Sequence, residues 1–343
     1  MRKLLNTLYV TTPEIYLALD GETIVIRKNE ENLARLPLHN LEAIVTFGYT
    51  GASPALMGAC AKRNIDLSFL SQSGRFLARV IGQSRGNVTL RKEQYRVSDS
   101  EERSCVIARN FIIGKIYNSK WILERATRDH GMRLDVEQLK HVSFMMSSHL
   151  EEARRCNNLE QLRGIEGNAA SMYFGELNGL ILQQKEDFFF TVRNKRPPTD
   201  NVNAMLSFVY TLLAGDCASA LETVGLDAYV GFLHRDRPGR ASLALDLMEE
   251  LRGVVADRFV LSLINKKVVN GKGFVKRENG AVIMKDDMRK SVLSAWQERK
   301  REQMTHPFLE EKVEWGLVPF VQAMLLARHL RGDLDEYPPL LWK

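Results

Sequence analysis

One stretch of this sequence combines the residue types that metal-assisted chemistry on phosphodiesters requires. It covers Gly231–Val255 and reads GFLHRDRPGRASLALDLMEELRGVV. His234 leads into a basic turn with Pro238 and Gly239, and a run with helical spacing and three acids follows. An imidazole and carboxylates beside arginines can hold a metal ion and neutralise phosphate charge. An ordinary helix with a solvated acidic face would contain the same residues.

Two of the acids share one side of the predicted helix. Asp246 and Glu249 are three residues apart, and small residues follow on the same side, which leaves room for an ion. Glu250 falls outside this pair and is predicted to be a bystander. Carboxylate oxygens suit Mg²⁺, and the imidazole of His234 shifts the preference towards Mn²⁺. A solvated polar face remains the alternative for both acids.

A further acid, Glu166, is in line with an apolar stripe that begins at Ala170. Its carboxylate is therefore predicted to point towards the packed side, where a charge needs a cation, hydrogen bonds or a proton. Gly164 and Gly167 flank it, which suggests a helix start or the close approach of a backbone or ligand. The alternative is a first-turn acid stabilised by the helix dipole.

The bulk composition excludes several classes of protein. The hydrophobic content of 45% and charged content of 26% are ordinary for a globular chain. No run of about eighteen apolar residues is present, so no membrane association is expected. Walker, HExxH, GxSxG and GxGxxG motifs are missing. Four scattered cysteines without a CxxC pair predict reduced thiols in the cytoplasm: Cys60, Cys105, Cys156 and Cys217.

The net charge of +6 is modest, but the basic residues are clustered. Neutralising phosphates releases condensed counterions, so clustered cations favour a polyanionic partner. For any single cluster, a solvated surface is the alternative. The clusters are Arg85–Arg96, Arg193–Arg196, Arg235–Arg240, Lys266–Lys272 and Arg299–Arg301.

The sequence predicts two kinds of secondary structure in succession. Short strands dominate the beginning of the chain, with a hairpin at Asp20-Gly21 and a helix at Pro54–Arg63. The predicted strands are Leu4–Val10, Glu14–Leu19, Thr23–Arg27, Ala43–Phe47, Asp66–Leu70 and Phe76–Ile81.

Helical spacing takes over near residue 85. The fold class is therefore α+β, with a small β-rich N-terminal domain at residues 1–84 and a larger all-α C-terminal domain at residues 85–343. A small hairpin is expected within Lys272–Met284. The predicted helices are Glu101–Asp129, Val136–Leu150, Glu166–Gln184, Asn201–Glu222, Leu243–Lys266, Asp286–Glu302 and Glu314–Leu330.

Four motifs resemble those of the CRISPR-associated adaptation integrases, the "Cas-one" endonuclease family. In chain order they are GIEGNAASMYF, RPPTDNVNAMLSFVYTLL, GLDAYVGFLH and GFLHRDRPGRASLALDLMEELR. The strands before them and the helices around them also fit, so the resemblance covers nearly the whole chain. In detail the motifs are most similar to the subtype found with type I-C systems.

The resemblance implies that a glutamate, a histidine and an acid on the late helix hold Mg²⁺ or Mn²⁺. By motif these ligands are Glu166, His234 and Glu249, and Asp246 matches a family acid that supports the site or the DNA end. Basic residues beside the motifs are predicted to contact phosphates on grounds of local composition. They are Arg193, Lys195, Arg196, Arg235, Arg237, Arg240, Lys266 and Lys267.

The resemblance also implies partners and a reaction. Two homodimers, each assembled through the β-rich domain, flank a dimer of the small "Cas-two" partner and hold a short double-stranded DNA fragment, the spacer precursor. The 3′-hydroxyl of this fragment attacks a phosphodiester at the CRISPR repeat. The attack inserts spacer DNA into the CRISPR array, a step of antiviral defence. With water as the nucleophile, the same site is a nuclease.

Two other functions stay open on sequence grounds. One is a stand-alone, structure-specific DNA nuclease that acts without a partner. The other is a DNA-binding scaffold without catalysis, in which the acids are solvated. Release of nicks without joined product would favour the first, and a well-ordered site that binds no metal would favour the second.

Overall fold

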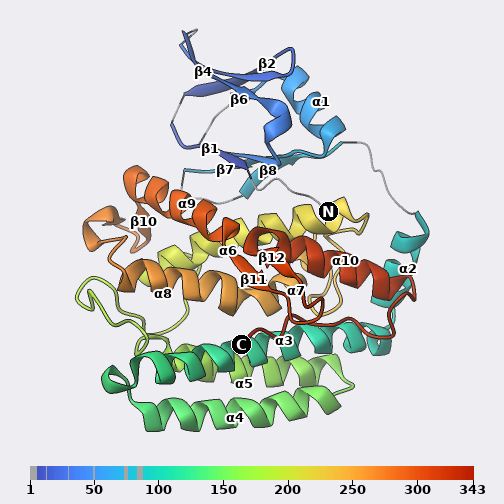
Figure 1. The fold of residues 1–343 in the computed structure, drawn as a ribbon, viewed down its shortest axis with the longest axis vertical. Helices are drawn as coiled ribbons and strands as arrows, with labels where there is room; N and C mark the ends of the chain where they lie inside the picture. Colours follow the sequence, from blue (N-terminus) through green and yellow to red (C-terminus); the bar gives the residue numbers. More distant parts are fainter. Residues whose placement is uncertain (1–5, 13, 30, 49–50, 73–75, 83–87) are drawn as a thin grey trace. The chain divides into compact units, whose positions relative to one another are not determined.

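The computed structural model describes residues 6–343 except 13, 30, 49–50, 73–75 and 83–87 (Figure 1). Residues 4 and 5 of the first predicted strand and residue 85 of the first basic cluster lie outside this range. The chain forms two compact units. Unit 1 contains Met1–Arg85 with Met284–Glu302, and unit 2 contains Gly86–Ile283 with Gln303–Lys343.

Helix α9 (Asp286–Arg301) groups with unit 1, whereas the sequence-based division placed it in the helical domain. Its contacts explain the difference, because the guanidinium of Arg289 lies 5.6 Å from the centre of the Phe47 ring. A segment distant in sequence thus completes the β-rich unit.

Unit 1 contains two four-stranded sheets. In one, β1, β5 and β7 are parallel and β8 is antiparallel to β7. In the other, β2, β3 and β4 are antiparallel neighbours and β6 runs parallel to β2. The expected hairpin is confirmed, since Asp20 pairs with Thr23. The strands are β1 (Thr7–Val10), β2 (Ile15–Asp20), β3 (Thr23–Lys28), β4 (Glu31–Pro37), β5 (Ala43–Phe47), β6 (Gly51–Ala52), β7 (Asp66–Leu70) and β8 (Phe76–Val80).

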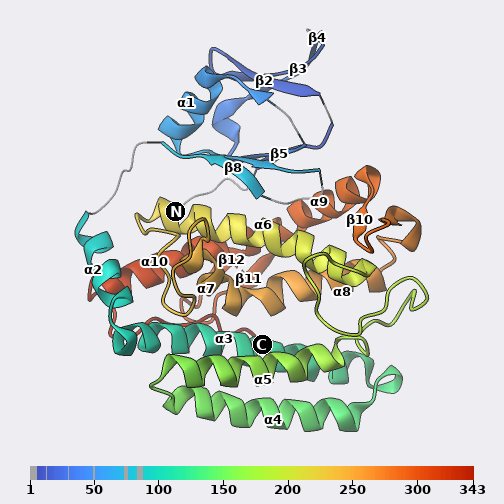
Figure 2. The ribbon, with the colours of Figure 1, turned by 180° about the vertical axis from the view of Figure 1, so that it is seen from behind.

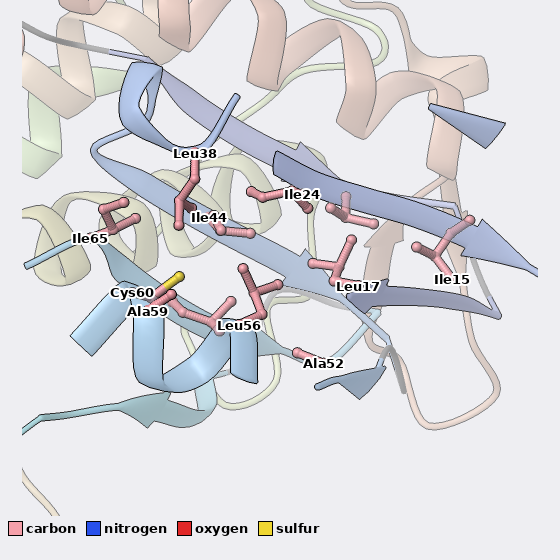
Figure 3. Packing of buried hydrophobic residues seen from close by; sticks show 12 residues of the cluster. Ile15, Leu17, Ile24, Leu38, Ile44, Ala52, Leu56, Ala59, Cys60 and Ile65 are labelled. Carbon is pink, nitrogen blue, oxygen red and sulfur yellow. The ribbon is translucent and has the colours of Figure 1, made fainter. Parts of the chain in front are cut away.

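The core of unit 1 is one apolar cluster between the strands and α1 (Pro54–Arg63). Figure 3 shows Leu17, Ile24, Ile44 and Leu56 converging in it, and all four are fully buried. The helix begins as predicted, with proline at its first position, because the Ser53 hydroxyl accepts a hydrogen bond from Leu56 N.

Unit 2 is mainly helical. Helices α3, α4 and α5 lie side by side (Figures 1 and 2), and α7 contacts both α3 and α6. The helices are α2 (Val88–Ser98), α3 (Glu101–His130), α4 (Val136–Arg155), α5 (Leu159–Leu177), α6 (Asn201–Thr223), α7 (Ser242–Leu251), α8 (Arg258–Asn265) and α10 (Val318–Leu330). Short strands complete it: β9 (Phe274–Lys276) pairs with β10 (Val282–Met284), as expected, and β11 (Gln303–Thr305) pairs with β12 (Lys312–Glu314). Short helical segments join these elements: η1 (Leu38–Asn40) in unit 1, and η2 (Gly131–Arg133), η3 (Arg252–Asp257), η4 (Gly271–Gly273) and η5 (Trp315–Leu317) in unit 2.

The predicted helix at Glu166–Gln184 is shifted in the structure. Helix α5 begins at Leu159, where the Asn158 side chain accepts from Gln161 N, and it ends at Leu177. Gly164 and Gly167 therefore lie inside the helix, and their Cβ positions would meet no atom within 4 Å. The glycines misled the prediction because their helix propensity is low, but the cap and the apolar stripe outweigh it.

A second departure concerns the predicted helix Leu243–Lys266. The structure interrupts it with η3, whose backbone is π-helical. Such segments add a residue to a turn, change which side chains align, and are frequent at functional sites. Glu249 and Arg252 lie on either side of the point where the α-helix becomes a π-helix.

One helix, α6, is long and apolar enough to cross a membrane by length and composition alone. Of its most apolar window, 67% is buried inside the protein, as is typical of a core helix. All four cysteines are buried and free, in agreement with the expected absence of a disulfide frame.

Candidate functional site

The acidic side of α7 is buried. Asp246 and Glu250 are fully buried and Glu249 is 5% exposed. A buried carboxylate must be paired or hydrogen bonded, because transfer from water is costly. The alternative of a solvated acidic face is therefore wrong for these three residues.

Asp246 binds the segment that carries His234. One of its oxygens accepts from Phe232 N at 2.7 Å and Leu233 N at 2.9 Å, and the other accepts from His234 N at 3.0 Å. The second oxygen also lies 2.6 Å from His234 Nδ1. If Nδ1 carries the proton, Nε2 presents a lone pair, which is the arrangement of metal-binding histidines backed by a carboxylate.

A glycine makes this close contact possible. A Cβ at Gly231 would lie 2.9 Å from Asp246 Oδ2 and from Ser242 Cβ. Any side chain there would push the segment away from α7, so glycine is required for the approach of His234.

Glu166 and Glu249 are brought together by a lysine that the sequence analysis did not select. Lys115 on α3 pairs with Glu166 Oε1 and lies 2.6 Å from Glu249 Oε2. The side chains of Lys115 and Glu249 are 9% and 6% exposed, and that of Glu166 is 25% exposed. Glu166 also lies well inside α5, so the reading as a first-turn acid is wrong.

Arg252 completes the charge balance. Its Nη2 lies 2.8 Å from Glu249 Oε1, and its guanidinium lies 4.8 Å from the centre of the Tyr210 ring. Burial favours the neutral form of Glu249, but the charges of Arg252 and Lys115 outweigh burial and lower the pKa of Glu249 to about 2. Glu249 is thus a carboxylate at neutral pH.

A second buried acid, Asp257, lies at the end of η3. It accepts a 2.5 Å hydrogen bond from the Tyr210 hydroxyl. Burial raises the pKa of Asp257 to about 6, although the Tyr210 hydrogen bond and the Arg252 charge oppose the rise. A pocket beside it is lined by residues that include Lys115, Glu166 and Arg252.

The expectation that Glu250 is a bystander is wrong. Its carboxylate accepts from the Tyr337 hydroxyl, from Gln322 Nε2 at 3.0 Å and from Leu340 N at 2.8 Å. Burial raises the pKa of Glu250 to about 7, against these hydrogen bonds. Glu250 therefore anchors the segment 337–343 on α7, beside the candidate site.

The three predicted metal ligands do not form one cluster. In the described part of the chain, no three side chains of His, Cys, Asp and Glu converge closely enough to hold an ion. Glu166 and Glu249 meet at Lys115, while His234 pairs with Asp246. The carboxylates of Glu166 and Glu249 nevertheless suit a hard divalent cation, since both already contact the ammonium of Lys115. Glu249 Oε2, despite its contact with Lys115, has no directed hydrogen bond among the described residues.

The predicted phosphate contacts fall into two groups. Arg193 is engaged inside the protein: its guanidinium donates to Asn203 Oδ1 at 2.7 Å and Ser207 Oγ at 3.0 Å. Arg240 is half-buried and donates to Ser242 Oγ. The others are exposed: Lys195, Arg196, Arg235, Arg237, Lys266 and Lys267.

A further arginine that the sequence analysis missed connects two parts of the site. Arg163 lies on α5, one turn before Glu166, and donates to Leu233 O at 2.7 Å. It thus fixes the segment before His234 to the helix that carries Glu166. Its position three residues before Glu166 is a signal that sequence could have offered.

Residues 8–298 match the family described as CRISPR associated protein Cas1. Among curated relatives, "CRISPR-associated endonuclease Cas1 2" of Rhodospirillum rubrum is 50% identical, with 100% of both chains covered. "CRISPR-associated endonuclease Cas1 1" of Chlorobaculum tepidum is 47% identical, again over 100% of both chains.

Solved structures have the same fold at lower identity. A casposase bound to integration product has a TM-score of 0.84 at 24% identity, covering 98% of this chain and 94% of that one. A Cas1 protein from Thermotoga maritima has a TM-score of 0.81 at 21% identity, covering 95% of this chain and 97% of that one. A Cas6-RT-Cas1–Cas2 complex has a TM-score of 0.81 at 20% identity, covering 98% of this chain and 36% of that one.

Proposed function

This chain belongs to the CRISPR-associated Cas1 family, and we propose that it is a divalent-metal-dependent DNA integrase and endonuclease of CRISPR adaptation. In this proposal the 3′-hydroxyl of a spacer precursor attacks a phosphodiester of the CRISPR repeat. The endonuclease names of the full-length relatives support it, as does the fold shared with a casposase bound to integration product. The observation that carries it is the meeting of the half-buried Glu166 and the buried Glu249 around one cationic side chain.

Each residue of the site has a stated part in this chemistry. Glu166, Glu249 and His234 would hold Mg²⁺ or Mn²⁺, which as a Lewis acid polarises a phosphoryl oxygen and activates a hydroxyl nucleophile. Asp246 would orient the imidazole of His234 by accepting a hydrogen bond from Nδ1–H through Oδ1. Arg252 keeps Glu249 ionised. The exposed Arg235 and Arg237 are available for phosphate charge.

The protein would act with a second copy of itself and with Cas2, in the cytoplasm. Two homodimers, each assembled through unit 1, would flank the small Cas2 partner. Exposed apolar side chains on the strands of unit 1 (Tyr16, Leu33 and Phe76) support a homodimer interface there. The fold shared with a Cas6-RT-Cas1–Cas2 complex supports the Cas2 partner. The free, buried thiols support a cytoplasmic location for the protein.

A joining assay tests the function. A labelled fragment with a 3′-hydroxyl is incubated with a supercoiled plasmid carrying the repeat, with or without Cas2, in Mg²⁺, Mn²⁺ or EDTA. We expect joined product only with a metal ion. Glu166→Ala, His234→Ala and Glu249→Ala should each lose roughly 100-fold or more of it while DNA binding persists.

Glu176→Ala is the matched control, since Glu176 lies on α5 and bonds only to the Gln138 side chain among the contacts described for its carboxylate. It should join DNA like the wild type. Nicks without joined product would favour the stand-alone nuclease. DNA binding with neither product, in every metal, would favour the scaffold.

A further inference from the structure

Lys115 is a buried cation between two apolar residues of its helix. It lies between Gly114 and Ile116 on α3, and its side chain is 9% exposed. A buried ammonium is costly unless it is paired, so a lysine at this position requires close counter-charges.

Its counter-charges are the carboxylates proposed as metal ligands. Lys115 Nζ pairs with Glu166 on α5 and with Glu249 on α7, the latter at 2.6 Å. Without a cation between them, the two carboxylates would repel each other. Lys115 therefore holds three helices of unit 2 at one point.

The contact with Glu249 is close but lacks the direction of a hydrogen bond. Arg252 also binds the other oxygen of Glu249 at 2.8 Å, so Glu249 would remain paired if the ammonium moved. Lysine has a flexible stem of four carbons and a point-like charge, so it can move without displacing its helix.

We propose that Lys115 is a resident cation of the metal site: it neutralises Glu166 and Glu249 in the metal-free protein, and a divalent ion binds in competition with its ammonium. This inference rests on the metal site proposed above. The ammonium and the ion compete for the two carboxylates, since like charges at such distances repel. Lys115 thus weakens metal affinity while it preserves the geometry of the ligands.

The test is the affinity of the full chain for Mn²⁺, measured by the electron paramagnetic resonance of free Mn²⁺ and by calorimetry. Lys115→Met removes the charge and retains a flexible, unbranched side chain that is one atom shorter. We expect its Kd for Mn²⁺ to fall roughly 10-fold. Lys115→Arg retains a competing cation and should stay within about 3-fold of the wild type. Lys120→Met on the same helix is the control, because the Lys120 ammonium lies over the Trp121 ring, and it should not change Kd.

A folded Lys115→Met protein with unchanged or weaker Mn²⁺ binding would overturn the competition, because the lysine would then support the ligands. If the wild type and Glu249→Ala bind Mn²⁺ equally, or neither binds it, the proposed metal site itself is wrong. The two failures are therefore distinct.

A measurement on the wild type keeps the inference testable if Lys115→Met does not fold. Acetylation of lysines, followed by mass spectrometry, reports how accessible each ammonium is. We expect acetylation of Lys115 to rise at least about 5-fold when Mg²⁺ replaces EDTA, since a displaced ammonium leaves its buried pairs. Equal acetylation in both conditions would contradict displacement.

Discussion

Asp246 and Glu249 lie about one turn apart on α7, and their surroundings give them different tasks. Asp246 accepts from three backbone N–H groups and from the His234 ring, so its oxygens are committed. Glu249 contacts only cationic side chains, Lys115 and Arg252, among the partners described for it. The hydrogen-bond partners therefore distinguish the two acids: Asp246 positions His234, and Glu249 is available to a metal ion.

Replacing Asp246 with asparagine should uncouple His234 from the site. The amide keeps the shape but accepts on one atom only, so the contact to His234 Nδ1 or those to the backbone are weakened. We expect Mn²⁺ affinity to fall about 10–100-fold, as for other residues that orient a metal-binding histidine. Calorimetry on Asp246→Asn measures this, and Asp236→Asn in the exposed turn is its control. Equal affinities of the two variants would remove the orienting role of Asp246.

Asp257 should give the metal-free protein a stability that depends on pH. Its pKa is raised by burial to about 6 in the folded state, against 3.8 for the ordinary group. Between these values the unfolded chain is ionised while the folded chain holds the proton, so the free energy of unfolding falls as pH rises. Over the whole interval the loss amounts to about 3 kcal/mol.

Urea unfolding in EDTA at pH 4 and pH 6.5 measures this loss. Asp257→Asn does not titrate, so its free energy of unfolding should fall less than that of the wild type over the same range. The other acids titrate in both proteins and cancel in the comparison. Parallel pH profiles would show that Asp257 does not hold the proton.

At the scale of elements, the site depends on the close approach of α3 to α7. A Cβ at Gly114 would lie 2.7 Å from Glu250 Cβ and 3.2 Å from Pro339 Cβ. Gly114→Ala should therefore force the helices apart and lower the free energy of unfolding by about 1–3 kcal/mol. Chemical denaturation measures it, and joining activity should fall too, because Lys115 and Glu249 are adjacent to the contact.

Gly175→Ala is the matched control. Gly175 lies inside α5, and its Cβ position meets nothing within 4 Å. Alanine is the better helix former, so this variant should gain about 0.5–1 kcal/mol. If Gly114→Ala and Gly175→Ala both lower the free energy of unfolding, the space around each glycine does not determine the effect.

Local signals predicted most elements because each depends on neighbouring residues. Helices α4 and α6 begin at the predicted residues, Val136 and Asn201, because the Asp135 and Asp200 side chains each accept from the backbone N–H three residues on. The strand β4 was missed because it is mostly exposed and has no apolar alternation. Helix α2 was missed because it is short and mostly polar and basic, which leaves little apolar periodicity.

The site could be predicted only in part for a related reason. Glu166, His234, Asp246 and Glu249 were selected by motif, and each of them lies in or beside the buried network. Lys115 and Arg252 were missed because their pairing joins residues far apart in sequence or across a π-helical turn. A lysine flanked by apolar residues on α3 was the available signal.

At the scale of the whole molecule, the exposed basic residues should determine how DNA affinity depends on salt. Replacing one phosphate contact reduces the magnitude of the negative slope of log K against log salt by about 0.9. Lys195→Gln should show this change, since Lys195 is exposed. Arg193→Gln should leave the slope unchanged and lower stability, because Arg193 is bonded to Asn203 and Ser207.

Fluorescence anisotropy from 50 to 250 mM salt measures both slopes. Local composition groups Arg193 with the phosphate contacts, whereas its hydrogen bonds place it inside the protein, so the two variants decide between these assignments. A reduced slope for Arg193→Gln would return it to the DNA-binding surface.

If Glu166, Glu249 and His234 share one divalent ion, anomalous scattering from Mn²⁺-soaked crystals will place that ion among all three side chains. We expect a single strong peak within coordination distance of a carboxylate oxygen of each glutamate and of His234 Nε2, with the Lys115 ammonium moved away. Saturating Mn²⁺ with no peak at these residues, and with Lys115 still between Glu166 and Glu249, would contradict it.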